Sequence, residues 1–557
     1  MRRWLAGAVA VAVAVTWYLI VPASPVTLSP AAGSLPPVRG AIHIHTRRSD
    51  GTGTAEEVAA AASRAGLQFV ILTDHGDGTR GSDTPLYRSG VLCIDAVEIS
   101  TNGGHVVALD LPQTPFPLGG EASDVIEDVR RMGGMSIAAH ADSARPQLGW
   151  TDWSVDVDGL EWLNGDSQWR DEDWRSIGHA MLTYPFRRAA TLATLLDRPD
   201  DLMRRWDTLL QTRPVVALAA ADAHARIGPG SDPYGRSFSF HLPSYEQVFR
   251  TFSIAVPEIQ LKGDAREDAR KVVDAIRAGH VYSMVDALAA PGRFLFSASS
   301  GSHRALMGDE VPIEGAVRLN VESNAPAGSN IRLLADGTTI ASSAPPTLEY
   351  EAASSPAVYR VEIDLANAPG TTPVPWVVSN PIYVGRRATR DSSKASVISD
   401  TRMVYANGSV ADWRVEKSAR SEATLSAARA VEGTQLLLRY GLGGTLAEGP
   451  YVAAVIASSS ELTRFTGVRF TARSLQPMRL TFQVRATGTD RRWGKSVYLD
   501  QMARTVTIAF DEMLPLGEAT GRPVLADVRD LLFVVDTVHT KQGASGQVWL
   551  DDISYVR

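Results

Sequence analysis

Cysteine is almost absent from this chain of 557 residues, which contains only Cys93. A single thiol forms no internal disulfide bond and supplies no multi-cysteine zinc site. Because Cys93 lies within an apolar run of strand length, we expect it to be an inert, packed residue. The cysteine content therefore leaves the redox compartment open, and export has to be argued from the start of the chain.

Basic runs are absent too, and the net charge is −7. A surface that follows a nucleic-acid backbone needs clustered lysine and arginine side chains, so we expect no nucleic-acid carrier role. The hydrophobic content of 44% is ample for packed cores, and a chain of this length allows three or four domains.

The longest apolar run stands near the N-terminus. Two arginines precede a charge-free run from Trp4 to Val21, and a Pro/Ser/Gly-rich linker follows over residues 25–37. Positive charge ahead of such a run keeps the start of the chain inside the cell and sends the rest outward. Val21 and Ala23 form a passable cleavage site, while about eighteen apolar residues are also enough to span a bilayer. Residues 1–24 are thus predicted to be a signal peptide or a membrane anchor, with a buried helix as the alternative. The protein is predicted to be secreted, periplasmic or membrane-anchored, with its catalytic domain outside the cytoplasm.

Potential metal ligands concentrate between Ala41 and His75. His43 and His45 are separated by one residue on a predicted strand, so their imidazoles point to the same side and can chelate one ion. Asp50 and His75 follow within the same stretch. The stretch therefore predicts a metal site at a strand end.

The segment between these residues predicts the order strand, helix, strand. Thr54 and Glu57 fit a capping box, and the Ala-rich run behind them predicts a helix that ends near Gly66. Residues 67–73 form a largely apolar run, as in a parallel strand buried on both faces. Polar ligands at the carboxyl ends of such strands are typical of α/β sites.

The same signature recurs downstream on further apolar runs, which carry Glu98, His105, His140, Asp222 and His224. Asp222 and His224 repeat the spacing of one intervening residue. A hydrogen-bonded core or surface histidine is the ordinary explanation for any one of these residues, but it does not account for six of the eleven histidines on or beside such runs.

Taken in order, HIHTRRSDG, ILTDH, the segment from Glu98 to His105, AHAD and AADAH resemble the motifs of the PHP (polymerase and histidinol phosphatase) metallohydrolase superfamily. The resemblance covers about half of the chain. It implies an α/β fold over residues 38–290, a distorted (β/α)7 barrel, with two or three divalent metal ions at the carboxyl ends of its strands. The ligand sets that it implies are His43, His45, Glu98 and Asp222 for one ion, Glu98, His105 and His140 for a second, and Asp50, His75 and His224 for a third.

Four further residues are candidates for supporting roles. Asp74, beside a ligand, either fixes an imidazole tautomer or caps the next turn. Arg47, Arg145 and Arg226 each follow a ligand motif closely and are candidates for binding substrate phosphate, since a planar guanidinium matches phosphate oxygens. Each of the three is otherwise a solvated surface charge.

The tryptophans are expected mainly in packing. Trp169, Trp174 and Trp206 lie in a Trp- and Arg-rich region between two ligand motifs, and we expect them in core or lid packing rather than in a recognition site. Trp413, Trp493 and Trp549 lie near the C-terminus, where stacking on sugar rings is the alternative to core packing.

From residue 291 onward the pattern changes to short alternating runs separated by turn residues. Residues 291–385 predict an immunoglobulin-like β-sandwich, and residues 386–402 predict a linker. Residues 403–557 predict a jelly roll that resembles galactose-binding domains or carbohydrate-binding modules. A glycan is therefore a possible partner of the last domain.

Three functions remain open. The first is a metal-dependent phosphoesterase that uses a metal-bound hydroxide at a di- or trinuclear centre. The ion would be zinc, manganese or iron, because imidazole and carboxylate ligands without thiolate suit all three metals. The second uses the same ions to hydrolyse a carbamate or carboxylic ester. The third is a surface-attached binding protein with a non-catalytic barrel. The partners expected are a small or phosphorylated substrate, a possible glycan and, if the N-terminal segment is retained, the membrane.

Overall fold

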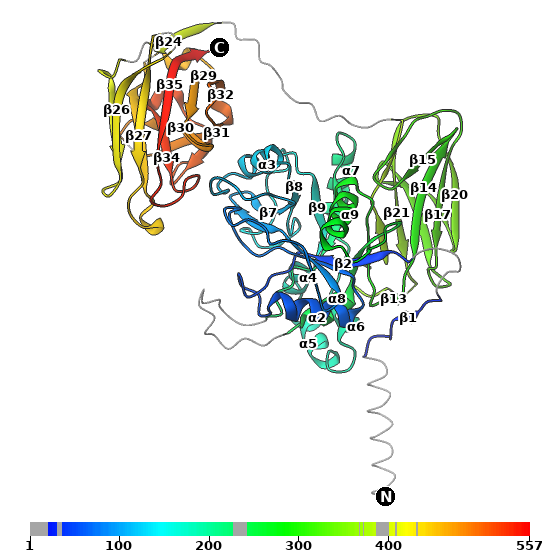
Figure 1. Ribbon diagram of the computed structural model, residues 1–557. Helices are drawn as coiled ribbons and strands as arrows, with labels where there is room; N and C mark the ends of the chain where they lie inside the picture. Colours follow the sequence, from blue (N-terminus) through cyan, green and yellow to red (C-terminus); the bar gives the residue numbers. More distant parts are fainter. Residues whose placement is uncertain are drawn as a thin grey trace, which may run out of the picture. The chain divides into compact units, whose positions relative to one another are not determined.

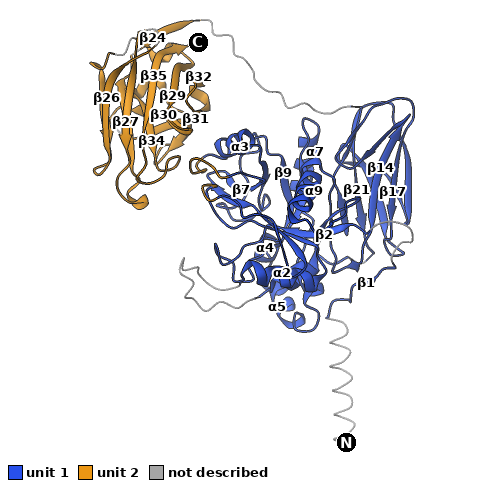
Figure 2. Ribbon diagram, in the orientation of Figure 1, with its two compact units in different colours: residues 1–77, 81–112, 121–390 blue, residues 78–80, 113–120, 391–557 orange. Residues whose placement is uncertain are grey.

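The computed structural model describes residues 21–29, 36–226, 242–366, 368–370, 372–385, 400–406, 409–430, 433–459, 461–488 and 490–557. The chain divides into two compact units, shown in Figure 2: unit 2 comprises residues 78–80, 113–120 and 391–557, and unit 1 the remainder. The predicted leader over residues 4–20 and most of the predicted linker at 386–402 lie outside the described residues. Within the described parts of the chain, no helix is both long and apolar enough to cross a membrane.

Unit 1 begins with strands of two open sheets rather than a closed ring. One sheet has the order β10-β9-β8-β7-β6, and the other runs from β4 through β5, β3, β2, β11 and β12 into the β-sandwich that follows. Figure 1 labels β7, β8 and β9 of the first sheet and β2 of the second. The strands of the first sheet are β6 (Val97–Thr101), β7 (Gly104–Leu109), β8 (Met135–Ala138), β9 (Gly159–Asn164) and β10 (Val216–Ala220). Those of the second are β2 (Val38–Ile42), β3 (Phe69–Leu72), β4 (Leu86–Arg88), β5 (Val91–Asp95), β11 (Ser253–Val256) and β12 (Tyr282–Met284).

The expected distorted (β/α)7 barrel is therefore wrong. A (β/α)7 barrel needs parallel strands joined by helical crossovers, but β4 pairs antiparallel with β5, β6 with β7, and β11 with both β2 and β12. Among the eleven strands just named, parallel ladders join only β2-β3-β5 and β8-β9-β10. The tight turns that join β4 to β5 and β6 to β7 leave no room for the crossover helices that the barrel would require there.

The helices of unit 1 are α2 (Ala55–Ala65), α3 (Ala122–Arg131), α4 (Gly165–Arg170), α5 (Trp174–Thr183), α6 (Arg188–Ala193), α7 (Asp200–Leu210), α8 (Tyr245–Thr251) and α9 (Ala265–Ala278). The capping box predicted for the first of them is confirmed. Thr54 and Glu57 exchange both hydrogen bonds at the N-terminus of α2, and Gly66 ends the helix in the left-handed region at φ 78°.

The sandwich strands of unit 1 form two sheets over one core. The first sheet holds β14 (Phe294–Ser300), β15 (His303–Leu306), β17 (Val317–Ser323) and β20 (Thr347–Ala352). The second holds β16 (Glu310–Val311), β18 (Asn330–Ala335), β19 (Thr338–Ser343), β21 (Ala357–Asp364), β22 (Val377–Ser379) and β23 (Ile382–Val384). Pairing of β22 with β12 makes this sheet continuous with the ligand-bearing region. Part of the predicted linker at 25–37 also joins the fold, because β1 (Val26–Thr27) pairs with β13 (Ala289–Ala290).

Unit 2 confirms the β-sandwich predicted for the C-terminal region. One sheet contains β24 (Thr401–Tyr405), β26 (Glu422–Arg429), β27 (Thr434–Gly441), β29 (Gly467–Ser474), β32 (Arg504–Ala509) and β35 (Ser545–Val556). The other contains β25 (Trp413–Lys417), β28 (Tyr451–Ala457), β30 (Met478–Ala486), β31 (Arg492–Leu499), β33 (Leu514–Leu516) and β34 (Val528–Asp536). Among the described residues of unit 2, four short 3₁₀ turns connect strands: η1 (Leu446–Glu448), η2 (Leu462–Arg464), η3 (Phe510–Glu512) and η4 (Leu525–Asp527). Trp413 and Trp493 lie in the core between the sheets, as the packing alternative expected.

Candidate metal centre

The structure brings all nine predicted metal ligands together. His43, His45 and Asp50 follow β2, His75 follows β3, Glu98 lies on β6, His105 lies on β7, His140 follows β8, and Asp222 and His224 follow β10. Two isolated parallel bridges join these strand ends, Ile44 with Ala223 and His75 with Glu98. The site thus forms where the ends of the two open sheets meet.

Three of the ligands have backbone conformations that side chains rarely adopt. The φ angles are 64° at His43, 32° at His140 and 45° at Asp222. Left-handed backbone at residues other than glycine costs of the order of 1–3 kcal/mol each and persists where the surrounding structure imposes it. The fold therefore holds these three side chains in place against their own backbone preference.

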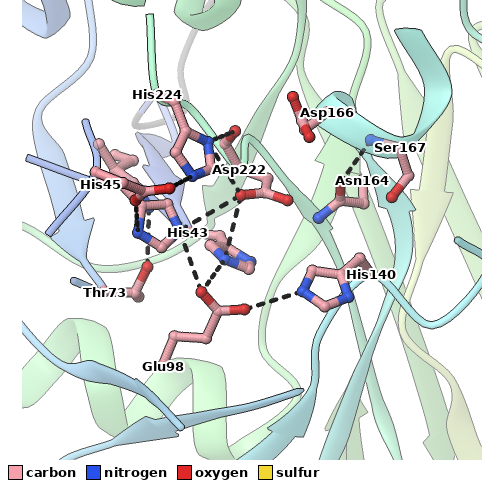
Figure 3. A network of polar contacts seen from close by, with 12 residues as sticks. His43, His45, Thr73, Glu98, His140, Asn164, Asp166, Ser167, Asp222 and His224 are labelled. Atoms are coloured by element: carbon pink, nitrogen blue, oxygen red, sulfur yellow. Dashed lines mark hydrogen bonds and ion pairs between the residues drawn. The ribbon is translucent and has the colours of Figure 1, made fainter. Parts of the chain in front are cut away.

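Glu98 is the centre of the cluster (Figure 3). Its Oε2 lies 3.3 Å from His43 Nε2, 3.2 Å from His45 Nε2 and 3.1 Å from His75 Nδ1. Its Oε1 lies 2.7 Å from His105 Nδ1 and 2.9 Å from His140 Nε2. One carboxylate is thus shared by five imidazoles.

The remaining carboxylates complete the cluster around the same imidazoles. Asp222 Oδ1 lies 3.4 Å from Nε2 of both His43 and His45. The carboxylate of Asp50 lies 3.5 Å from His45 Nδ1 and 3.3 Å from His224 Nε2. Each of the nine predicted ligands therefore lies within about ion-pair distance of at least one other.

Three buried atoms at the centre have no hydrogen-bond partner: His43 Nε2, His45 Nε2 and Glu98 Oε2. A buried polar atom left unpaired costs about 1–3 kcal/mol, and such groups call for an explanation. Nitrogen and oxygen lone pairs that converge without a donor between them are the arrangement that a cation satisfies. The donor set, imidazole and carboxylate, suits zinc, manganese or iron.

Potential ligand atoms within 4.8 Å of one another form three groups: His43, His45 and Glu98; His75, Glu98 and His105; and His45, Asp50, His75 and His224. The sets implied by the family resemblance differ in detail. The structure adds His45 to the third set and His75 to the second, while His140 and Asp222 stand beside the groups through their contacts with Glu98 and His43.

Carboxylates dominate the electrostatics of the cluster. Burial lowers the pKa of His43, but Asp222 and Glu161 outweigh it and hold that pKa well above its ordinary value. Burial likewise opposes a charged His45, yet the carboxylates of Asp222 and Glu98 beside its Nε2 raise its pKa to about 10. Burial raises the pKa of Glu98, but the neighbouring histidines hold it well below the usual range. The centre thus favours positive charge, which protons or divalent ions supply in competition.

Glu161, on β9, is a functional residue that the sequence analysis missed. Its Oε1 lies 2.6 Å from His43 Nδ1, and its Oε2 accepts hydrogen bonds from the His140 backbone N–H at 2.6 Å and from Asn164 Nδ2 at 2.8 Å. A carboxylate on the second nitrogen of a ligating histidine fixes the ring and its tautomer. The signal available in the sequence was a single acidic residue inside the apolar run Gly159–Asn164.

Asp74 supports the loop rather than a ligand imidazole. Its carboxylate accepts hydrogen bonds from the Thr46 backbone N–H, the Thr46 hydroxyl and the Ser49 hydroxyl, each at 2.7 Å. These bonds hold the turn that leads to Asp50. Gly51 closes the same turn so tightly that an added Cβ would lie 2.2 Å from the His45 carbonyl oxygen.

A cavity of about 350 Å³ opens over the cluster. Two of the three candidate arginines, Arg145 and Arg226, line it, together with Arg170, which the sequence analysis did not single out. Arg170 pairs with Asp166, also in the cavity wall. Arg47 does not line this cavity and instead contacts the Thr52 carbonyl and Glu57. The cavity wall thus brings arginine side chains near the carboxylates and imidazoles of the cluster.

No family model matches the chain, and no curated protein matches it. Solved structures similar to part of the chain include carbohydrate-binding modules. The family 11 module of a cellulosomal cellulase from Clostridium thermocellum is 14% identical, with 29% of this chain and 96% of that chain covered and a TM-score of 0.25. A family 30 module of a Clostridium thermocellum cellulase is 11% identical, with 28% and 95% covered and a TM-score of 0.22. A module described by its mannan recognition is 10% identical, with 29% and 97% covered and a TM-score of 0.20.

Proposed function

We propose that this protein is an exported metal-dependent hydrolase of phosphoric esters, related to the PHP superfamily through its ligand set. The observation that carries the proposal is the convergence of nine imidazole and carboxylate side chains on one cavity, with unpaired buried atoms at their centre. Clustered divalent ions supply polarisation of a phosphoryl oxygen and a lowered pKa of a bound water.

The residues of the chain divide the remaining tasks. The three groups of neighbouring ligand atoms would hold the ions, and Glu98 would belong to two of these groups. Glu161 orients the His43 ring. Arg145, Arg170 and Arg226 supply positive charge at the rim, where it favours an anionic substrate such as a phosphate ester.

The test combines metal analysis of the purified full chain with hydrolysis of nitrophenyl phosphate, bis-nitrophenyl phosphate, naphthyl carbamate and naphthyl acetate. We expect bound divalent metal and turnover of a phosphate ester, both lost in His105→Ala. The matched control is His280→Ala, because His280 pairs with Asp309 outside the cluster. Turnover of only the carbamate or acetate would instead support the runner-up, a carbamate or carboxylic ester hydrolase.

A second candidate function, glycan binding by the terminal sandwich, is favoured by Trp549. This residue is half-buried on β35, and the Arg473 guanidinium stacks 3.8 Å from the centroid of its ring. Its cross-strand neighbours are Leu437 and Arg473. Aromatic rings on an exposed sheet face stack on sugars. Affinity electrophoresis in mixed-linked glucan and in mannan tests this function: Trp549→Ala would abolish retardation, whereas the buried Trp493→Phe would keep it. A full chain without metal or hydrolysis but with glycan retardation would make binding its main role.

A further inference from the structure

Helix α5 carries large apolar side chains in solvent. Trp174 is 76% exposed, Met181 73% and Leu182 66%, and Phe186, in the turn after the helix, is 58% exposed. The spacing of Trp174, Met181 and Leu182 places them on one face of the helix, while Ala180 and Thr183 face the interior. We call these four exposed residues the α5 apolar patch. Of the core or lid packing expected for Trp174, packing in the core is wrong, because the side chain is exposed.

The patch lies beside the point where the chain enters the fold. Arg187, the residue after Phe186, donates a hydrogen bond from Nη1 to the Pro22 carbonyl oxygen at 2.5 Å. Val21, which precedes Pro22, is buried. Figure 1 shows α5 and α6 at the end of unit 1 where the described chain starts. The segment that carries the α5 apolar patch is therefore hydrogen-bonded to the first described residues.

In the sequence, Val21 is also the last residue of the charge-free apolar run that starts at Trp4. A run of that length is enough to span a bilayer. When it does so, Pro22 stands at the boundary between lipid and water, and Arg187 must stand there with it. The α5 apolar patch ends one residue before Arg187, so it lies close to the same boundary.

We propose that the α5 apolar patch seats the catalytic unit on the bilayer from which the chain emerges. This inference rests on the export in the proposed function and on retention of the apolar run 4–21 as a membrane anchor. Tryptophan and phenylalanine favour the membrane–water interface, and an exposed apolar helix face inserts into it. Arg175 and Arg188 flank the patch, and their long stems let their charges reach the headgroup layer.

The contact is apolar rather than electrostatic, because Asp171, Glu172 and Asp173 directly precede α5 and offset the arginines. Seating therefore does not require anionic lipid. Phosphatidylcholine vesicles without added anionic lipid are the appropriate probe. The seating would also fix the distance of the metal-binding cavity from the membrane and limit the enzyme to substrates that reach this zone.

The native thiol makes a site-specific test possible. Cys93 is buried, and burial raises its pKa to about 11, so that it stays unreactive at neutral pH. A polarity-sensitive fluorophore can therefore be attached to the full chain at Met181→Cys alone. The matched control is Ile340→Cys, an exposed apolar position of unit 1 on β19.

Both labelled chains are reconstituted into phosphatidylcholine vesicles with plain or brominated acyl chains. We expect brominated lipid to quench the label at position 181 several-fold more than the label at 340, and soluble iodide to do the reverse. Equal iodide quenching at both positions would overturn the proposal. Protection of position 181 from both quenchers would overturn it as well, since a second copy or the N-terminal run would then cover the patch.

Flotation and hydrolysis on the same samples separate this inference from the proposed function. Flotation without lipid quenching at 181 overturns the seating alone. Loss of flotation overturns both the anchor and the seating. Lipid quenching in a chain that hydrolyses none of the four esters leaves the seating standing and overturns the phosphoesterase.

Discussion

Replacing Glu161 with glutamine tests whether this buried carboxylate tunes the metal centre. The change keeps the side-chain shape and one acceptor oxygen but removes the charge that faces His43 Nδ1 at 2.6 Å. Both carboxylate oxygens are in use, one facing His43 and the other accepting hydrogen bonds from the His140 backbone N–H and from Asn164. Glutamine puts an NH₂ donor in place of one of these two oxygens. Loss of such a partner behind a metal-ligating histidine typically lowers metal affinity by about 10–100-fold, which corresponds to about 1.4–2.8 kcal/mol.

The assay is a competition of the full chain with a chromophoric chelator at neutral pH, with zinc and manganese titrated separately. Glu362→Gln is the control, because Glu362 is an equally buried carboxylate that pairs with arginines away from the cavity. We expect Glu161→Gln to weaken metal binding and Glu362→Gln to leave it unchanged. Equal metal affinity of the Glu161 variant and the wild type, with the fold intact by circular dichroism, would refute the assigned role.

Three further predictions concern stability, pH and substrate binding. Glu362→Ala leaves the fully buried Arg360 without one of its partners and is expected to lower the free energy of unfolding by about 3–5 kcal/mol, as measured by urea denaturation. With metal removed by a chelator, the pKa of His45 is about 10 in the folded protein against 6.5 in the unfolded chain. The stabilisation that protonated His45 gives the fold is therefore complete below pH 6.5 and is lost as the pH rises towards 10. The melting temperature should fall over that range, and a melting temperature independent of pH would contradict the assignment. Arg145→Ala should raise KM for an aryl phosphate by about tenfold, equal to about 1.4 kcal/mol, without changing metal content; an unchanged KM would remove Arg145 from substrate binding.

The local structure around the ligands could be read from the sequence where it depends on neighbouring residues. The capping box of Thr54 and Glu57 and the terminating Gly66 set the limits of α2, because the groups that satisfy the helix ends lie within three or four residues. The paired spacing of His43 with His45 placed two imidazoles together for a similar reason. Alternation along a strand is a local property.

The supporting residues and the sheet connections could not be read in this way. Glu161 lies 118 residues from His43 in sequence, and nothing local marks it as a partner of that imidazole. The antiparallel hairpins that rule out the barrel have loops too short for crossover helices, yet their strands have the same apolar character as parallel ones. The exposed position of Trp174 likewise depends on what packs against α5.

By itself the sequence identified the candidate metal ligands, because imidazoles and carboxylates that end successive apolar strands are the pattern expected of a cation site. Only the tertiary structure decided that all nine meet around Glu98, since this requires two open sheets to touch at their ends through single bridges. It also decided which arginines face the cavity and which apolar side chains stay in solvent. Such facts depend on packing between segments far apart in the chain, and no short stretch of sequence contains them.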